Sequence, residues 1–382
     1  MRRHGSAYLE RFGASILPSH ARALDAILHC RTPAMGGHVA VCSQCGAEHL
    51  LFHSCRHRAC PQCGHDAAEN WVARQRKLLL PVTYFHVVFT LPAELRRLVR
   101  SHQAALLPVL FQAAFDSLAR LCADPRFLGV QIGALAVLHT WTRTLEWHPH
   151  IHMLVPGVGL APDGATIRTV PRHRKRFLVP VRALAKIFRA RFLRLARRVV
   201  PGDALPQIPW GKPWVVFAKA AVQGADKVLE YLGRYVHKTA IADNAITSID
   251  DRSVTFRYCD SRTHERKAMT LPAQEFLRRF LQHVLPKGMH RVRAFGLLHP
   301  AHRRSLLQLQ LTLAQRPAPS SATPASPARS RLRCPTCNGS MRLLHPVTPE
   351  SCAAIVAARG PATHRSRAPP PPAPGPAAQE AA

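Results

Sequence analysis

The spacing of apolar residues along this chain predicts several amphipathic helices. Between residues 7 and 35, apolar side chains recur at intervals of three and four, the period of a helix with one buried face. Similar patterns recur later in the chain, and Pro81 ends one of them. The predicted helices cover residues 7–35, 67–80, 93–122, 180–199, 225–240 and 273–284.

Short segments rich in β-branched and aromatic residues alternate irregularly with these helices, which is typical of buried strands. The predicted strands cover residues 84–91, 134–142, 150–155, 214–221, 253–258 and 267–271. Short connections after residues 142 and 258 favour hairpins. Helices and hairpins in irregular alternation predict an α+β fold class, with an antiparallel sheet flanked by helices.

The charge of the chain points to a polyanionic partner. Its 382 residues include 53 Lys and Arg against 21 Asp and Glu, a formal charge of +32. The excess is not confined to a tail, because basic residues are also dense in 95–100, 172–198 and 262–304. A basic excess spread over several elements favours nucleic acid as the partner.

The chain shows no sign of export or membrane insertion. No segment reaches the roughly 18 consecutive apolar residues of a membrane span, and the first residues, MRRHG, lead into no signal-peptide core. We therefore expect a cytoplasmic protein, associated with the nucleoid when bound to DNA, and no membrane partner. In such a compartment the 11 cysteines are better explained as metal ligands than as disulfides.

Two C-x-x-C pairs near the N-terminus, Cys42 with Cys45 and Cys60 with Cys63, predict one structural Zn²⁺ site. Each pair can hold one side of a tetrahedral ion, and two pairs complete a closed site. Further cysteines and histidines lie nearby. They could bind a second ion or replace one of the four ligands, and we favour core or surface residues over ligands. These residues are Cys30, His38, His49, His53, Cys55 and His57.

Composition divides the chain into three parts. Residues 1–80 hold the N-terminal helix and the zinc-binding module, and residues 81–315 hold all six predicted strands. Residues 316–382 contain a Pro- and Ala-rich linker, the pair Cys334 and Cys337, and a tail with the composition of disorder. Together with Cys352, that pair supplies at best a partial zinc ribbon.

Two short motifs carry candidate catalytic chemistry. His150 and His152 are two apart on a predicted strand, so both imidazoles point to one face and can bind one metal ion. Tyr231 and Tyr235 are four apart on a predicted helix, so both phenols lie on one face, with Lys238 about one turn further on. A metal, two nucleophiles and a cation are the parts needed to cut a DNA strand and hold its end.

The order of these motifs resembles that of the rolling-circle HUH nucleases. Phe-Thr-Leu at 89–91 is followed by His-Ile-His at 150–152 and then by Tyr-Val-His-Lys at 235–238. Tyr-Leu-Gly-Arg at 231–234 repeats the last motif in altered form, as in members with two tyrosines.

A closer resemblance is to the transposases of the insertion sequence 91 family, carried by segments 54–63, 84–92 and 231–235. It covers about residues 10–300. One departure is the segment 142–144, Thr-Arg-Thr, where the family usually has small and amide residues. The resemblance implies an N-terminal zinc-binding domain and a two-tyrosine HUH domain that binds Mg²⁺ or Mn²⁺.

The resemblance also implies a reaction. Tyr231 or Tyr235 attacks a phosphate of single-stranded DNA at an element end and forms a 5′-phosphotyrosine, and a second transfer joins the strand to target DNA. Lys238 is expected to contact phosphate, Glu146 is a weak candidate for a third metal ligand, and the zinc module is expected to help bind element ends. We expect Trp71, Trp141 and Trp147 to be core residues rather than base-stacking platforms.

Three other functions fit parts of the sequence. A rolling-circle replication initiator or relaxase would use the same chemistry. A metallohydrolase of the H-x-H-x-D-H type lacks support because no Asp-His pair follows His152. A non-catalytic zinc DNA-binding protein would leave the histidine and tyrosine motifs without a role. The sequence leaves the oligomeric state open.

Overall fold

The computed structural model describes residues 1–171, 177–209, 211–221, 225–236, 240–260, 263–314 and 332–359. Its helices are α1 (Gly5–Phe12), α2 (Pro18–His29), α3 (His65–Arg76), α4 (Ala93–Ser101), α5 (Gln103–Ala123), α6 (Val181–Ala196), α7 (Ala225–Val236), α8 (Ala273–Leu281), α9 (Arg303–Ala314) and α10 (Pro349–Arg359). Its strands are β1 (Gly37–Cys42), β2 (Glu48–Phe52), β3 (Tyr84–Thr90), β4 (Gln131–Trp141), β5 (Trp147–Pro156), β6 (Val158–Leu160), β7 (Ile167–Thr169), β8 (Val216–Ala220), β9 (Ile246–Ile249), β10 (Ser253–Cys259), β11 (Arg266–Pro272), β12 (Val292–Gly296) and β13 (Met341–Val347). The α+β fold class is confirmed. The helix predicted over 7–35 is two helices, because Pro18 starts a new one.

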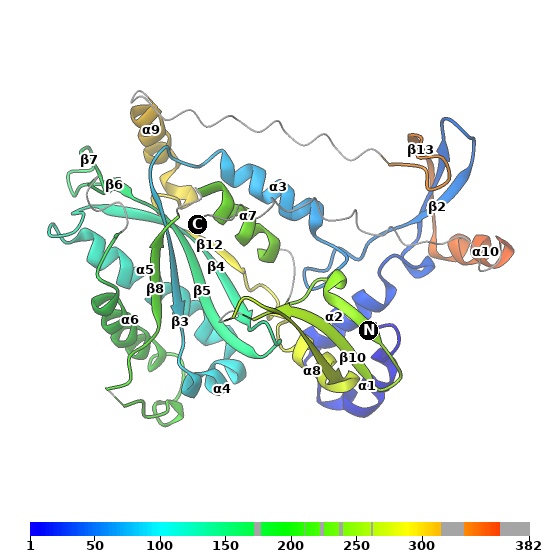
Figure 1. The fold of residues 1–382 in the computed structure, drawn as a ribbon, viewed down its shortest axis with the longest axis horizontal. Coiled ribbons are helices and arrows are strands. Elements are labelled where there is room, and N and C mark those ends of the chain that lie inside the picture. Colours follow the sequence, from blue (N-terminus) through cyan, green and yellow to red (C-terminus); the bar gives the residue numbers. More distant parts are fainter. Residues whose placement is uncertain are drawn as a thin grey trace, which may run out of the picture.

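The largest sheet is antiparallel, with strand order β7-β6-β4-β5-β3-β8, and β12 pairs with the same edge of β4 as β6 does (Figure 1). Strands β4 and β5 form the predicted hairpin, and β3 lies on the other side of β5. All six predicted strands are present, with bounds shifted by three residues or fewer.

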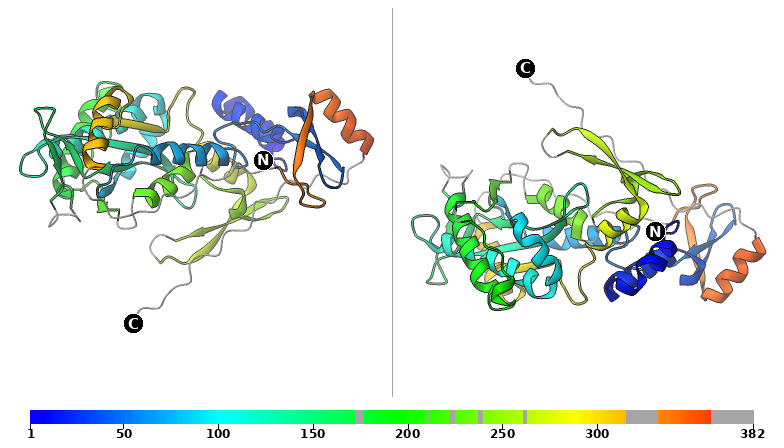
Figure 2. Two further views of the ribbon diagram at one scale, coloured as in Figure 1. Left: turned by 90° about the horizontal axis from the view of Figure 1, so that it is seen from above. Right: turned by 90° about the horizontal axis from the view of Figure 1, so that it is seen from below.

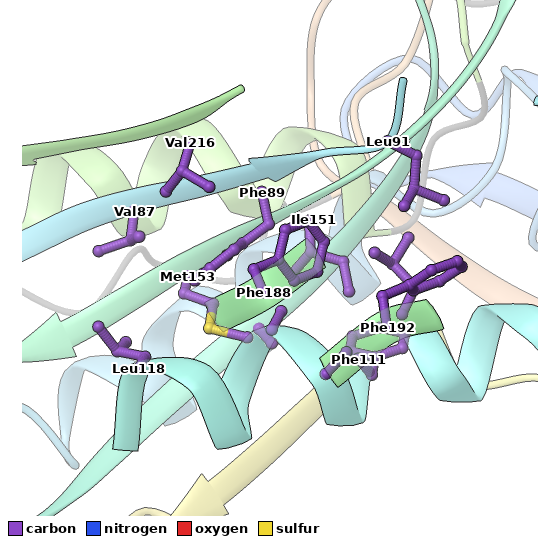
Figure 3. Close-up of a cluster of buried hydrophobic side chains, with 14 of the residues drawn as sticks. Val87, Phe89, Leu91, Phe111, Leu118, Ile151, Met153, Phe188, Phe192 and Val216 are labelled. Atoms are coloured by element: carbon purple, nitrogen blue, oxygen red, sulfur yellow. The ribbon is translucent and has the colours of Figure 1, made fainter. Parts of the chain in front are cut away.

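One face of this sheet packs on α5 and α6. Alternate residues of β3 and β5 point into that core, among them Phe89 and Ile151, which are fully buried. Phe89 meets Phe188 of α6 edge to face at 5.0 Å between ring centroids (Figure 3). Helix α5 is the one described helix long and apolar enough to cross a membrane, and 61% of its apolar window is buried inside the protein. We therefore assign α5 to the core of the fold.

The opposite face is covered by α7, with α3 and α9 beside it. Leu135 of β4 and Leu154 of β5 share a buried cluster with Leu229 and Leu232 of α7. Helix α3 packs on α7, where a side-chain carbon on Gly233 would lie 2.3 Å from Val72 Cγ2. Glycine at this position is therefore what allows the two helices to approach so closely.

The N-terminal helices do not form an isolated domain. Residues of α1 and α2, including Tyr8 and Leu24, share a buried cluster with α8 and the β10–β11 hairpin. The predicted boundary at residue 80 therefore crosses a continuous core, and the domain division stays a prediction.

A separate three-stranded sheet, in the order β13-β1-β2, lies at the far end of the molecule, with α10 beside it (Figure 2). The C-terminal strand β13 pairs with β1, so segments about 300 residues apart in sequence lie side by side. The predicted linker and the tail fall on residues 315–331 and 360–382, outside the described residues.

Candidate metal centre and tyrosine helix

Three histidines converge at one end of the β4–β5 hairpin. His150 and His152 lie on β5, and the register places His139 of β4 directly opposite His150. Their candidate ligand nitrogens all lie within 4.8 Å of one another. The structure thus brings together the two predicted ligands and adds His139, which the sequence analysis did not single out. Glu146 is exposed in the turn between the strands and lies outside this group, so its assignment as third ligand is not supported.

Hydrogen bonds orient two of these rings. His150 donates from Nδ1 to the carbonyl oxygen of His148 at 2.6 Å, because a carbonyl can only accept. Its Nε2 therefore carries the lone pair that can bind a metal. His152 Nδ1 lies 2.8 Å from Nε2 of His86 on β3. His86 thereby holds the His152 ring in place, as outer partners of metal-binding histidines commonly do.

The electrostatics of the cluster favour neutral rings. Burial lowers the pKa of His150 to about 4. Burial, with smaller contributions from neighbouring histidines, lowers the pKa of His139 and of His152 well below the usual value. Only the neutral imidazole offers a lone pair to a metal, so at neutral pH all three rings are in the form that binds a cation.

The turn between the two histidine-bearing strands is held by hydrogen bonds from residues far away in the sequence. Leu145 has a left-handed backbone, with φ of 62°, and its carbonyl accepts from Gln282 Nε2 at 2.9 Å and His283 Nε2 at 3.1 Å. Arg279 donates to the carbonyl of Thr144 at 2.9 Å. The end of α8 and the residues after it therefore hold the strand ends in register.

Helix α7 carries both predicted tyrosines and covers the same sheet face as the histidines. Val137 lies opposite His152 in the β4–β5 register and belongs to the buried cluster that α7 completes. Tyr231 and Tyr235 lie in α7, with their side chains outside the described part of the structure. Lys238 falls on residues 237–239, which are likewise outside it.

The edge strand β8 presents an aromatic ring on the histidine face. Phe217 lies opposite Val88 in the β3–β8 register, and Val88 lies opposite His152. The Phe217 side chain is 42% exposed and meets His86 edge to face, with ring centroids 6.3 Å apart. Lys219 Nζ is 5.5 Å from the Phe217 centroid. In contrast, the three tryptophans expected in the core, Trp71, Trp141 and Trp147, are buried.

The cysteines form two clusters instead of the single predicted site. The first contains Cys30, Cys55, Cys60 and Cys63, and the second contains Cys42, Cys45, Cys334 and Cys337. The predicted grouping of Cys42 and Cys45 with Cys60 and Cys63 is therefore wrong, and Cys30 and Cys55 lie within reach of the metal that Cys60 and Cys63 could bind. Ligation by each of the four predicted cysteines remains a prediction.

The first cluster has the dimensions of a tetrahedral thiolate site. Four sulfurs at ~2.3 Å from Zn²⁺ are ~3.8 Å apart. Cys63 Sγ lies 3.4 Å from Cys30 Sγ and 3.7 Å from Cys55 Sγ. Helix α3 begins directly after this cluster, at His65, and packs on α7. The cluster thus fixes the start of the helix that supports the tyrosine helix.

Comparisons with known proteins agree with this architecture. Residues 1–91 match a family described as "Transposase zinc-binding domain", and residues 133–305 match one described as "Putative transposase". The zinc-binding match and the thiol clusters support structural Zn²⁺. No solved structure matches the chain.

Two relatives extend over most of the chain. "Putative transposase y4qJ" of Sinorhizobium fredii is 40% identical over 368 residues, covering 88% of this chain and 91% of the relative. "Transposase for insertion sequence element IS801" of Pseudomonas savastanoi pv. phaseolicola is 29% identical over 296 residues, covering 71% of this chain and 68% of the relative. Since the zinc-binding match, the transposase match and near full-length similarity coincide, the chain belongs to the insertion sequence 91 family of transposases, proteins that cleave and transfer DNA strands.

Proposed function

We propose that this transposase nicks and joins single DNA strands through 5′-phosphotyrosine intermediates and so moves a rolling-circle insertion sequence. One observation carries the proposal: three neutral imidazoles gather on the sheet face that α7 also covers, and α7 carries Tyr231 and Tyr235. The candidate cation site and the helix that carries the two candidate nucleophiles thus lie on one face of the sheet.

His139, His150 and His152 would hold the divalent cation. When bound, the cation would polarise the scissile phosphate and neutralise the charge that develops on it. Imidazole nitrogens suit transition-metal ions, whereas Mg²⁺ prefers oxygen ligands. Of the two ions expected from the sequence, Mn²⁺ therefore suits this set of ligands better.

The strand transfer conserves a phosphodiester bond. The phenolic oxygen of one tyrosine loses its proton and attacks phosphorus, and the bond from phosphorus to the 3′ oxygen breaks. The products are a 5′-phosphotyrosine and a 3′-hydroxyl, which takes up a proton. Since one phosphodiester replaces another, attack by a different 3′-hydroxyl joins strands without ATP. A second tyrosine on the same helical face allows a second cleavage before the first link is resolved.

The substrate proposed is single-stranded DNA at the element ends. Exposed aromatic side chains beside positive charge bind unpaired strands by stacking on bases and contacting phosphates. Phe217 and Lys219 offer that combination on the strand beside His86. Lys238, one turn beyond Tyr235 in sequence, is proposed to contact phosphate as well.

Covalent capture tests the proposal. Labelled single-stranded DNA from the element ends is incubated with protein and Mn²⁺ and separated on a denaturing gel. We expect a protein–DNA adduct that is absent in EDTA and absent when Tyr231 and Tyr235 are both changed to Phe. The double variant should still bind DNA, because only two hydroxyl groups are removed. Adduct formation by the double variant would refute the assignment of these tyrosines.

A further inference from the structure

We propose that Cys42, Cys45, Cys334 and Cys337 bind a second structural Zn²⁺, and that this ion clasps the C-terminal segment 332–359 onto the N-terminal β1–β2 hairpin. Cys42 Sγ lies 3.4 Å from Cys337 Sγ, and Cys45 Sγ lies 3.7 Å from Cys334 Sγ. These separations are close to the ~3.8 Å edge of a tetrahedral zinc–thiolate site. The inference is independent of the proposed strand-transfer function.

The two halves of the site have the same backbone geometry. In each C-x-x-C pair the residue after the second cysteine is left-handed: Gly46 with φ of 69° and Asn338 with φ of 61°. Each of these residues donates its N–H to the carbonyl of the first cysteine, Gly46 to Cys42 at 3.1 Å and Asn338 to Cys334 at 2.9 Å. This turn directs both sulfurs of a pair to one side, as a shared metal ion requires.

The two turns are fitted to each other. Ser43 donates its backbone N–H to the carbonyl of Ser340 at 3.0 Å. A side-chain carbon on Gly339 would lie 2.5 Å from Gln44 Oε1 and 3.1 Å from Cys42 Sγ. Glycine at 339 therefore leaves room for the N-terminal turn to lie against the C-terminal one.

Apolar packing alone is too slight to hold this segment. The buried side chains shared by the hairpin and α10 are Val39, Leu50 and Cys352, with four partly buried apolar side chains packed against them. Strand β13 is otherwise largely exposed, including Leu343 and Leu344. Small units with so little core commonly depend on a metal ion or a disulfide. A thiolate site at the base of the β13–β1 pair supplies the missing stabilisation.

The soft ligands identify the ion. Four cysteine thiolates in tetrahedral arrangement favour Zn²⁺ over hard cations such as Mg²⁺. Half of these ligands lie beyond residue 91, where the match to the zinc-binding domain ends. The N-terminal module of this chain is therefore complete only when its C-terminal segment returns to it.

Zinc content tests the site directly. We expect two Zn²⁺ per purified full-length chain under reducing conditions, and one after Cys334→Ser with Cys337→Ser. Cys259→Ser is the matched control, since Cys259 belongs to neither cluster, and it should retain two. One Zn²⁺ in the wild type, or an unchanged count in the double variant, would overturn the proposal.

A cut in the linker tests the clasp. A protease site is inserted within 316–328, the chain is cleaved, and the pieces are separated by gel filtration. The C-terminal piece should remain bound to the rest of the wild-type chain and be released by a zinc chelator or by the two serine substitutions. Release of the C-terminal piece from the wild-type chain before chelation would contradict the clasp. So would retention of that piece both in the serine variant and after chelation of the wild type.

Discussion

The histidine site and the cysteine clusters are both candidate metal sites made of short motifs, yet they depend on different levels of structure. The three histidines come from one hairpin, residues 139 to 152, whose register alone brings them together. The cysteines come from segments up to 295 residues apart, as between Cys42 and Cys337. Local geometry decides the histidine site, whereas the path of the whole chain decides that Cys42 and Cys45 meet Cys334 and Cys337.

The first cysteine cluster is nevertheless connected to the helix that covers the histidine face. The first cysteine cluster ends at Cys63, α3 follows from His65, and α3 packs on the tyrosine helix α7. Arg76 at the end of α3 donates to Asp226 of α7 at 2.9 Å and to Glu230 at 2.6 Å. Damage to the cysteine cluster should therefore reach α7, whereas damage to the histidines should stay local.

The largest expected effect is at the histidines. His139→Ala, His150→Ala or His152→Ala should each slow strand cleavage by at least about 10²-fold, since a catalytic cation supplies several kcal/mol of charge stabilisation. Glu146→Ala is the matched control and should cleave within a few-fold of wild type. The measurement is the single-turnover rate with Mn²⁺. Equal losses of cleavage rate in the His139 and Glu146 variants would show that the effect is not specific to the histidines that the strand register brings together.

The next effect is at the first cysteine cluster. Cys60→Ser should remove one Zn²⁺ per chain, because binding free energy of about 10 kcal/mol in zinc peptides is also folding free energy. We expect α3 to loosen from α7 and cleavage to fall while the histidine cluster stays intact. Hydrogen exchange across 65–76 and 225–236 would report the change. Normal amide protection in both helices after zinc loss would show that α3 and α7 do not depend on the first cysteine cluster.

A smaller effect is expected where α3 and α7 touch. Gly233→Ala places a methyl group against Val72 and should destabilise the fold by about 1–3 kcal/mol, the usual cost of overpacking. Val72→Ala in the same chain should recover most of the loss. Thermal unfolding of the single and double variants measures this, and additive losses would argue against the contact.

The smallest effect is expected at the proposed DNA platform. Phe217→Ala should weaken binding of single-stranded DNA by about 1–3 kcal/mol, the usual contribution of one stacked base. Phe217→Tyr keeps the ring and should bind nearly as well as wild type. Fluorescence anisotropy with a short oligonucleotide distinguishes them. Unchanged affinity in the alanine variant would remove Phe217 from the interface.

The sequence predicts the main-sheet strands that bear the site because alternation and β-branched residues are local signals. It predicts His150 and His152 because strand geometry fixes where residues two apart point. His139 required the hairpin register, and counting back from the turn would have misplaced it, because the register shifts between His139 and Trp141. The face on which Phe217 lies could not be predicted, because both faces of β8 carry apolar residues and only its edge position exposes the ring.

The cysteine grouping could not be derived from spacing. All three C-x-x-C pairs are followed by a residue suited to a left-handed turn, namely Gly46, Gly64 and Asn338. Nothing in that pattern says which pair meets which. The answer depends on the return of β13 to β1, a contact across a proline-rich stretch that carries no local signal.

In the proposed mechanism, α7 supplies the nucleophiles for a site built on the β4–β5 hairpin. The most direct measurement is to digest the adduct formed with single-stranded element-end DNA and Mn²⁺ and to map the modified peptide by mass spectrometry. We predict a nucleotide phosphate attached to Tyr231 or Tyr235, and no adduct in the His150→Ala variant. A modified residue outside α7, or an adduct that forms equally well without His150, would contradict it.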